Sequence, residues 1–200
     1  MLFDLLRTAK PRLADICVDS VPAPWCNQRT MSWIQTYTGR RFRPQDPAAG
    51  DFDIRDVAHA LSLLCRFNGH CRVFYSVAEH SVRVSQICPP DAALWGLLHD
   101  LGEAYIGDLP RPIKPLFPRF EEIETRLLRM AGEALGLAWP MPPEVRTADD
   151  IMLATEARDL MAPPPEPWPL TQRPLPGVIV PLDPPRAEAR FMQRYRELTA

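Results

Sequence analysis

The stretch LLHDLGEAYIGD at positions 97 to 108 places three ionisable side chains, His99, Asp100 and Glu103, in an apolar segment. Burying such groups costs free energy unless each finds a partner. On a helix, residues four apart share a face, so His99 and Glu103 should point the same way, with Asp100 one step round from His99. All three side chains could therefore enter one cleft.

Two further segments present ligand-type residues on apolar helical stripes. His80 shares its stripe with three apolar residues, Val77, Val84 and Ile87, and Asp149 shares one with Val145, Met152 and Glu156. Such stripes face the core of a protein. Imidazole nitrogens with carboxylate oxygens suit Mn, Fe, Co, Ni or Zn and leave positions open for water and substrate. We therefore expect a divalent transition metal where the three segments meet.

Simpler explanations exist for each residue taken alone. An inward His80 could be a hydrogen-bonded core residue. Asp149 and Asp150 could be a solvated pair in the first turns of a helix, where the helix dipole favours negative charge. The order His, His-Asp, Asp on three helices favours the metal site over these alternatives.

The helices that carry these residues should run between proline clusters. Proline makes up 24 of the 200 residues, against about 5% in a typical protein, and it is poorly tolerated inside helices. Ser76 and Glu79 form a capping-box pattern, so Glu79 is expected to cap a helix. The expected helices are 53–67, 76–87, 91–105, 118–137, 143–161 and 184–198, and the sequence GVIV predicts a strand at 177–180.

Composition excludes several classes of function. The net charge of −2 provides no basic field for a long nucleic acid. No apolar stretch is long enough to cross a bilayer, and the first twenty residues lack a signal-peptide core, so a cytoplasmic protein is expected. Five cysteines without a CxxC pair fit neither a disulfide framework nor a zinc knuckle.

The order His80, His99-Asp100, Asp149 resembles the signature of the HD-domain metal-dependent phosphohydrolases. YSVAEHS followed by LLHDLGEAYIGDLPRPIK is similar to the 5′-deoxynucleotidase and prophage-type branch, over roughly positions 31 to 161. The resemblance implies an all-α, compact helical bundle, here with proline-rich connections. It also implies one divalent metal held by His80, His99, Asp100 and Asp149, and hydrolysis of a nucleotide phosphate ester.

The resemblance also implies roles for residues around the metal. Glu103 matches an acidic residue near the attacking water, and Arg66 matches an arginine that contacts phosphate. Asp108 matches an aspartate that meets the sugar 3′-hydroxyl, although it could simply end a helix before Pro110. Phe67 stands where these enzymes have a tryptophan, so strict selectivity for deoxyribose is not implied.

His59 precedes Arg66 by two turns of the expected helix, so both should project the same way. If Arg66 contacts phosphate, His59 would line the same pocket; a solvent-facing histidine is the alternative. The expected organisation is an N-terminal extension at 1–30, a phosphohydrolase core at 31–161, and a proline-rich strap with a C-terminal helix at 162–200. The last helix should pack on the core through an apolar face formed by Ala187, Phe191, Tyr195 and Leu198. The favoured substrate is a (deoxy)nucleoside 5′-monophosphate. A triphosphate hydrolase and a non-catalytic nucleotide-binding module are the alternatives, and a homodimer is left open.

Overall fold

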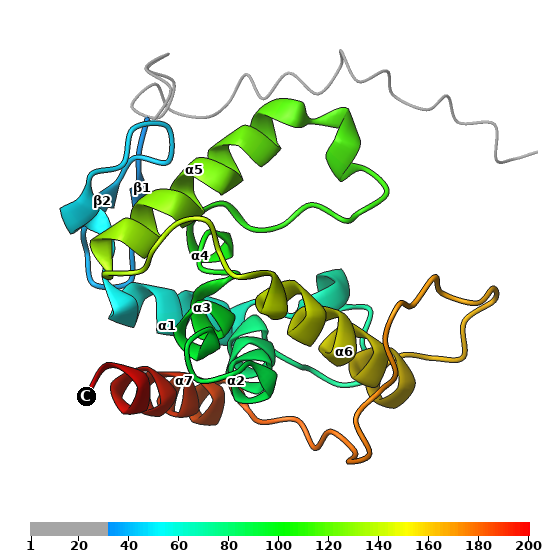
Figure 1. Cartoon of the computed structure of the whole chain (residues 1–200). Helices are drawn as coiled ribbons and strands as arrows, with labels where there is room; N and C mark the ends of the chain where they lie inside the picture. The colour runs from blue at the N-terminus through cyan, green and yellow to red at the C-terminus, as the bar shows by residue number, and fades with distance from the viewer. Residues whose placement is uncertain (1–31) are drawn as a thin grey trace, which may run out of the picture. The chain divides into compact units, whose positions relative to one another are not determined.

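Helices dominate the described part of the chain, which is residues 32–200 of a computed structural model (Figure 1). The expected extension at 1–30 lies outside these residues. A short antiparallel hairpin, β1 (Ile34–Gln35) and β2 (Arg41–Phe42), comes first. The helices are α1 (Ile54–Leu63), α2 (Val77–Ile87), α3 (Ala93–Leu98), α4 (Glu103–Ile106), α5 (Pro118–Ala134), α6 (Pro143–Leu160) and α7 (Pro184–Thr199). The expected all-α fold class is confirmed.

A side-chain cap fixes where α2 starts. The Ser76 hydroxyl accepts a hydrogen bond from the Glu79 amide at 3.1 Å, which gives α2 the expected N-cap. The Glu79 carboxylate does not close a capping box; it accepts from the Leu182 amide at 2.7 Å and from Arg83. Glu79 thus ties the start of α2 to the segment that leads into α7.

Two apolar clusters hold the helices together. In one, Ala187 and Phe191 of α7 are buried with Val57 and Leu61 of α1, so the expected apolar face of the last helix packs on the core. The other joins α2, α3 and α6 through apolar side chains that include Trp95 and Met152. The three helices that carry the ligand-type residues therefore share one packed core.

The expected helix over 53–67 ends at Leu63. Beyond it the backbone pairs with a distant segment: the Arg66 amide donates to the Tyr75 carbonyl at 2.9 Å and the Val77 amide to the Leu64 carbonyl at 3.0 Å. Phe67 and Asn68 then adopt positive φ angles of 54° and 51°. Because α1 ends before Arg66, this residue lies off the helical face on which the sequence pattern had placed it.

The expected helix over 91–105 is interrupted at residues 99–102. The Gly96 carbonyl accepts a hydrogen bond from Nδ1 of His99 at 2.8 Å, in competition with the helical backbone. In the next turns each amide donates to the carbonyl three residues before it, instead of four as in an α-helix. One example is the Glu103 amide, which donates to the Asp100 carbonyl at 3.0 Å. Separate short helices, α3 and α4, therefore flank the His-Asp pair.

The prediction of a strand at 177–180 is wrong. Residues 161–183 form an extended strap between α6 and α7, drawn in orange in Figure 1. Side chains of α6 satisfy its backbone: Arg158 donates to the Leu175 and Gly177 carbonyls, and Asp159 accepts from the Ile179 amide at 2.8 Å. Of the three consecutive apolar residues in this segment, Ile179 is buried, whereas Val178 and Val180 are exposed.

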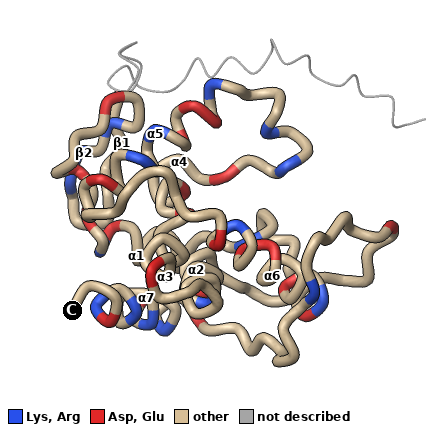
Figure 2. The backbone as a smooth tube through the Cα atoms, viewed as in Figure 1, with Lys and Arg blue, Asp and Glu red and all other residues tan. Residues whose placement is uncertain are grey.

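Charged residues of both signs are spread along the described part of the chain. Lys and Arg positions are interspersed with Asp and Glu positions on most elements (Figure 2). Within residues 32–200, no helix has the length and apolar character needed to cross a membrane.

Candidate metal centre

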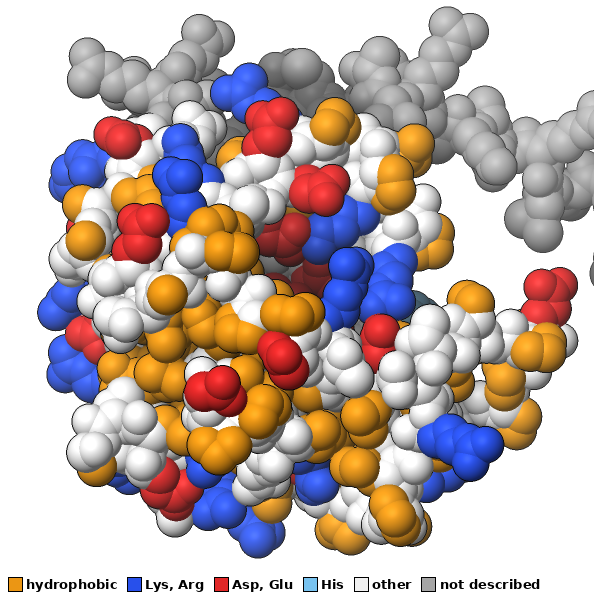
Figure 3. Space-filling view, in the orientation of Figure 1, with side chains coloured by type: hydrophobic (Ala, Val, Ile, Leu, Met, Phe, Trp, Pro, Cys, Tyr) orange, Lys and Arg blue, Asp and Glu red, His pale blue; other side chains and the backbone are white. Residues whose placement is uncertain are grey.

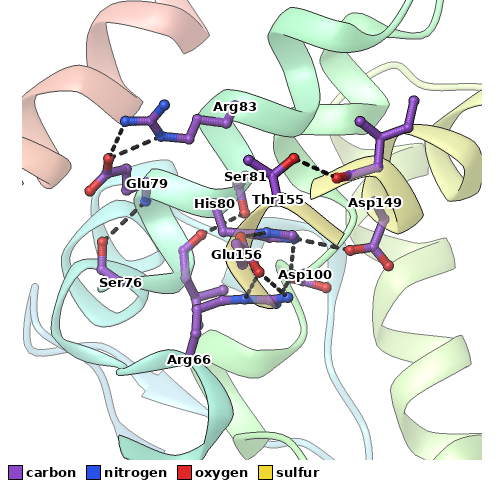
Figure 4. A network of polar contacts seen from close by, with 12 residues as sticks. Arg66, Ser76, Glu79, His80, Ser81, Arg83, Asp100, Asp149, Thr155 and Glu156 are labelled. Carbon is purple, nitrogen blue, oxygen red and sulfur yellow. Dashed lines mark hydrogen bonds and ion pairs between the residues drawn. The ribbon is translucent and has the colours of Figure 1, made fainter. Parts of the chain in front are cut away.

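Three helices bring His80, His99 and Asp149 to one point. Nε2 of His80 lies 3.3 Å from Nε2 of His99 and 3.2 Å from Oδ1 of Asp149. His80 comes from the first turn of α2 and Asp149 from α6 (Figure 4). His99 is the C-cap of α3. These three residues could hold a metal ion. Two nitrogens bound to one tetrahedral metal at about 2.1 Å lie about 3.4 Å apart, close to the spacing of the two histidines.

The tautomers of both histidines favour a cation at this point. Nδ1 of His80 lies 2.6 Å from the carboxylate of Glu156, which can only accept, and Nδ1 of His99 donates to the Gly96 carbonyl. In a neutral imidazole the other nitrogen then carries a lone pair. The two lone pairs face each other and the Asp149 carboxylate, so a positive charge is needed between them.

Asp100 completes the convergence of acceptors. Its Oδ2 lies 3.3 Å from Nε2 of His99 and 3.6 Å from Nε2 of His80. This oxygen is buried and has no hydrogen-bond partner among the described residues. An orphaned carboxylate oxygen beside two imidazole nitrogens fits a bound cation. All four expected ligand residues therefore lie together.

Glu156 belongs to this site, although the sequence analysis noted it only as part of the Asp149 stripe. Its carboxylate is fully buried, binds Nδ1 of His80 through Oε1, and accepts from Arg66 through Oε2 at 3.1 Å. A carboxylate that binds the outer nitrogen of a ligating histidine orients the ring and makes it a better ligand. The signal in the sequence was its spacing, since Glu156 follows Asp149 by two helical turns.

The electrostatics of the site follow from this packing. Burial and Arg66 lower the pKa of His80, but Glu156 and Asp149 outweigh them and raise it to about 9. Burial raises the pKa of Asp149, yet His80, His99 and Arg66 together lower it below its usual range. Both shifts have one origin, since the carboxylates and imidazoles of the group stabilise positive charge between them.

Arg66 lies at the edge of the ligand group. Its Nη1 is 3.5 Å from Oδ2 of Asp100, and its Nε and Nη2 donate to Glu156. Burial lowers the pKa of the Arg66 guanidinium, but Glu156 and Asp100 outweigh burial and raise the pKa above its ordinary value. The guanidinium therefore stays charged. Its side chain is 15% exposed, which leaves it open to a ligand from one side.

Glu103 lines a cavity of about 220 Å³ with His99 and Asp100. Burial, followed by the charges of Asp100 and Asp108, raises the pKa of Glu103 to about 9. Glu103 is not a member of the group of three that could hold a metal. A carboxyl group with a raised pKa beside a cation site has the properties of an acid-base residue.

The remaining expected residues lie around this centre or away from it. Asp108 is exposed and pairs with Lys114 at 3.3 Å; Lys114 in turn lines the cavity. Phe67 follows Arg66 directly, and its ring centroid lies 5.9 Å from that of Trp168 on the strap.

The placement of His59 is corrected by the structure. The expectation required one helix to carry both His59 and Arg66, but α1 ends at Leu63. His59 instead stacks on Tyr37, with centroids 3.6 Å apart, and its Nδ1 lies 3.0 Å from Glu188 of α7. It joins α1 to α7 rather than to the Arg66 group.

Comparisons with known proteins give relatives without an assigned activity. No family model matches the chain. The uncharacterized protein YfdR of Escherichia coli is 39% identical over 173 residues, which cover 84% of this chain and 97% of YfdR. The uncharacterized protein RCAP_rcc00048 of Rhodobacter capsulatus is 31% identical over 143 residues, which cover 64% of this chain and 73% of that protein. With this similarity along almost the whole of YfdR, the chain belongs to the same family as YfdR.

Proposed function

We propose that this protein is an HD-type, metal-dependent phosphohydrolase that cleaves the ester bond between the phosphate and the sugar of a nucleotide. The observation that carries the proposal is the convergence of His80, His99, Asp100 and Asp149 on one point, with Arg66 and Glu103 beside it. Acceptors alone meet at the centre, and the Arg66 guanidinium and the Glu103 carboxyl group lie beside it.

The four convergent residues would hold one divalent transition metal, for which a nitrogen and oxygen donor set is suited. When bound, such an ion polarises a phosphoryl oxygen and makes a nearby water more acidic. Glu156 supports this role because it holds the His80 ring with Nε2 turned toward the other ligands.

The chain's own residues would supply phosphate binding and proton transfer. Arg66 keeps its charge and offers N–H donors from a fixed planar group, which suits two oxygens of a phosphate. Glu103 would accept a proton from the attacking water and return it to the leaving sugar oxygen. Its raised pKa, caused first by burial, favours a group that can hold a proton between these steps.

A screen of nucleotides against metals tests the proposal. We expect the purified full chain to release product from nucleoside phosphates with one or more of Mn, Co, Ni and Mg, and to lose activity with chelator. A nucleotide that binds without being hydrolysed under any metal would favour a non-catalytic binding module.

Glu103→Gln separates catalysis from metal binding in the same assay. The amide keeps the shape but cannot accept a proton, so kcat should fall by about 10²- to 10⁴-fold while the metal content stays unchanged. Glu121→Gln, an exposed change on α5, is the matched control. Loss of the metal together with activity would make Glu103 a ligand and contradict this division of roles.

A further inference from the structure

The strap carries a half-buried tryptophan in a stretch that is otherwise exposed. Among residues 162–174, every side chain except that of Trp168 is exposed. The ring of Trp168 packs near that of Phe67, with the two centroids 5.9 Å apart and the planes tilted by 55°. This distance lies within the range of favourable aromatic pairs. The strap therefore meets the body of the protein at the residue that follows Arg66.

Phe67 reaches Trp168 from a strained turn. Phe67 and Asn68 adopt φ angles of 54° and 51°, which are unfavourable for residues other than glycine, and Gly69 follows at 80°. Such conformations persist where the surrounding structure holds them, and they cluster at ligand sites. In this turn the Phe67 ring lies beside Arg66, whose guanidinium carbon is 5.4 Å from the ring centroid. Phe67 thus adjoins both Arg66 and Trp168.

The chain after Trp168 borders open space close to the candidate metal centre. Residues 169–171 line a cavity of about 360 Å³ together with side chains of α6, among them Asp150. Asp150 follows the ligand-type Asp149 directly and accepts a hydrogen bond from Thr171 at 3.0 Å, which ties the strap to α6. Figure 3 shows acidic side chains inside a hollow of this face and basic side chains at its edge. A ligand bound at the candidate metal centre has room beside the strap.

We infer that Trp168 stacks on the base of a nucleotide whose phosphate lies between Arg66 and the candidate metal centre. The inference rests on the proposed function and adds a specificity-determining residue to it. Arg66, Phe67 and Trp168 follow one another in space as phosphate, sugar and base do in a nucleotide. Every base has an aromatic face, so an indole ring favours substrates that carry a base over other phosphate esters. Trp168 lies on the strap, beyond the segment 31–161 that resembles the HD-domain enzymes.

Binding of nucleotides to the full chain in chelator tests the stacking contact. By calorimetry, we expect the wild type to bind a nucleoside 5′-monophosphate more tightly than ribose 5-phosphate, which lacks the base. Trp168→Leu keeps an apolar side chain against Phe67 but offers no aromatic face, so nucleotide binding should weaken by about tenfold. Trp168→Phe keeps an aromatic ring and should stay within about threefold of the wild type. Val178→Ala, an exposed change on the same strap, is the control and should bind like the wild type.

Ribose 5-phosphate separates base binding from support of the fold. Neither Trp168 variant should change its binding, because this ligand offers no ring for stacking. Equal losses on the nucleotide and the sugar phosphate, or equal effects of leucine and phenylalanine, would overturn the inference and make Trp168 a structural anchor of the strap. A lowered unfolding midpoint with unchanged nucleotide binding would have the same meaning.

Kinetics distinguish this inference from the proposed function. With metal, Trp168→Leu should raise KM for a nucleoside monophosphate about tenfold and leave kcat within about twofold. Hydrolysis with an unchanged KM would overturn the inference alone. Nucleotide binding that depends on Trp168, without hydrolysis by the wild type under any metal, would support the stacking contact and contradict the phosphohydrolase. A wild type that binds no nucleotide would overturn both.

Discussion

The Glu156 carboxylate contacts both a candidate metal ligand, His80, and the neighbouring Arg66. One oxygen binds His80 and the other binds Arg66, and both the carboxylate and the His80 ring are fully buried. Burial raises the pKa of Glu156, but Arg66 and His80 outweigh it and hold the pKa below its usual range. The residue therefore stays charged, and its partners depend on that charge.

Replacing Glu156 should affect both stability and metal binding. Glu156→Ala leaves the buried Arg66 and His80 without their acceptor, so we expect a loss of about 3 to 5 kcal/mol in the free energy of unfolding. Glu156→Gln keeps an acceptor for His80; it should remain folded and bind metal about 10- to 100-fold more weakly. Urea unfolding and a metal titration measure the two effects, with the exposed Glu166→Ala as control. Metal affinity equal to wild type in Glu156→Gln would contradict its role in orienting His80.

At the scale of the elements, α5 closes over α3 where a glycine meets a tryptophan. A Cβ on Gly132 would lie 2.8 Å from Cζ2 of Trp95 and still closer to its Cη2. Trp95 is buried, and its indole N–H donates to the Ala138 carbonyl at 3.0 Å, so the ring is held on both sides. The seating of the Trp95 ring against α5 thus depends on the missing side chain of Gly132.

The substitution Gly132→Ala has two opposing effects on the free energy of unfolding, one from helix propensity and one from packing. Alanine favours the helix by up to about 1 kcal/mol over glycine, whereas overpacking a core costs about 1 to 3 kcal/mol. Because Trp95 is fixed by its hydrogen bond, we expect the packing cost to exceed the gain and the free energy of unfolding to fall. Glu133→Ala, the exposed neighbour, should change it by less than about 0.5 kcal/mol. A stabilised Gly132→Ala variant in urea unfolding would mean that Trp95 can move.

At the scale of the whole molecule, the candidate metal centre joins α2, α3 and α6 at residues far apart in the chain. An ion held there binds the folded state and has no assembled site in the unfolded chain. Metal binding should therefore contribute directly to the stability of the domain.

Metal should raise the melting temperature of the wild type but not that of ligand variants. At a free metal concentration one hundred times Kd, the stabilisation is about 2.7 kcal/mol, or roughly 5 to 10 °C for a chain of this size. Asp149→Ala and Asp100→Ala remove a ligand, so their melting temperatures should respond little to metal or chelator. A full metal response in Asp100→Ala would exclude Asp100 from the ligand set.

The sequence by itself determined the helices with strong local signals and the inward direction of the ligand residues. The Ser76 cap, the prolines at 143 and 184, and the apolar stripes through His80, Asp149 and Phe191 depend only on neighbours within a few turns. Such signals persist in any fold that keeps the helices. They were enough to place α2, α6 and α7 and to bring His80 and Asp149 toward the core.

Only the tertiary structure decided where Arg66, Glu156 and His59 act. Pairing of the Cys65 and Ser76 segments ends α1 and turns Arg66 toward Asp100, and the same ending separates Arg66 from His59. Glu156 became a partner of His80 across 76 positions of sequence, and the valines at 178 and 180 stayed exposed because no strand lies beside them among the described residues. The spacing of apolar residues indicates which side of an element is apolar. These contacts depend instead on which distant segment packs against that side.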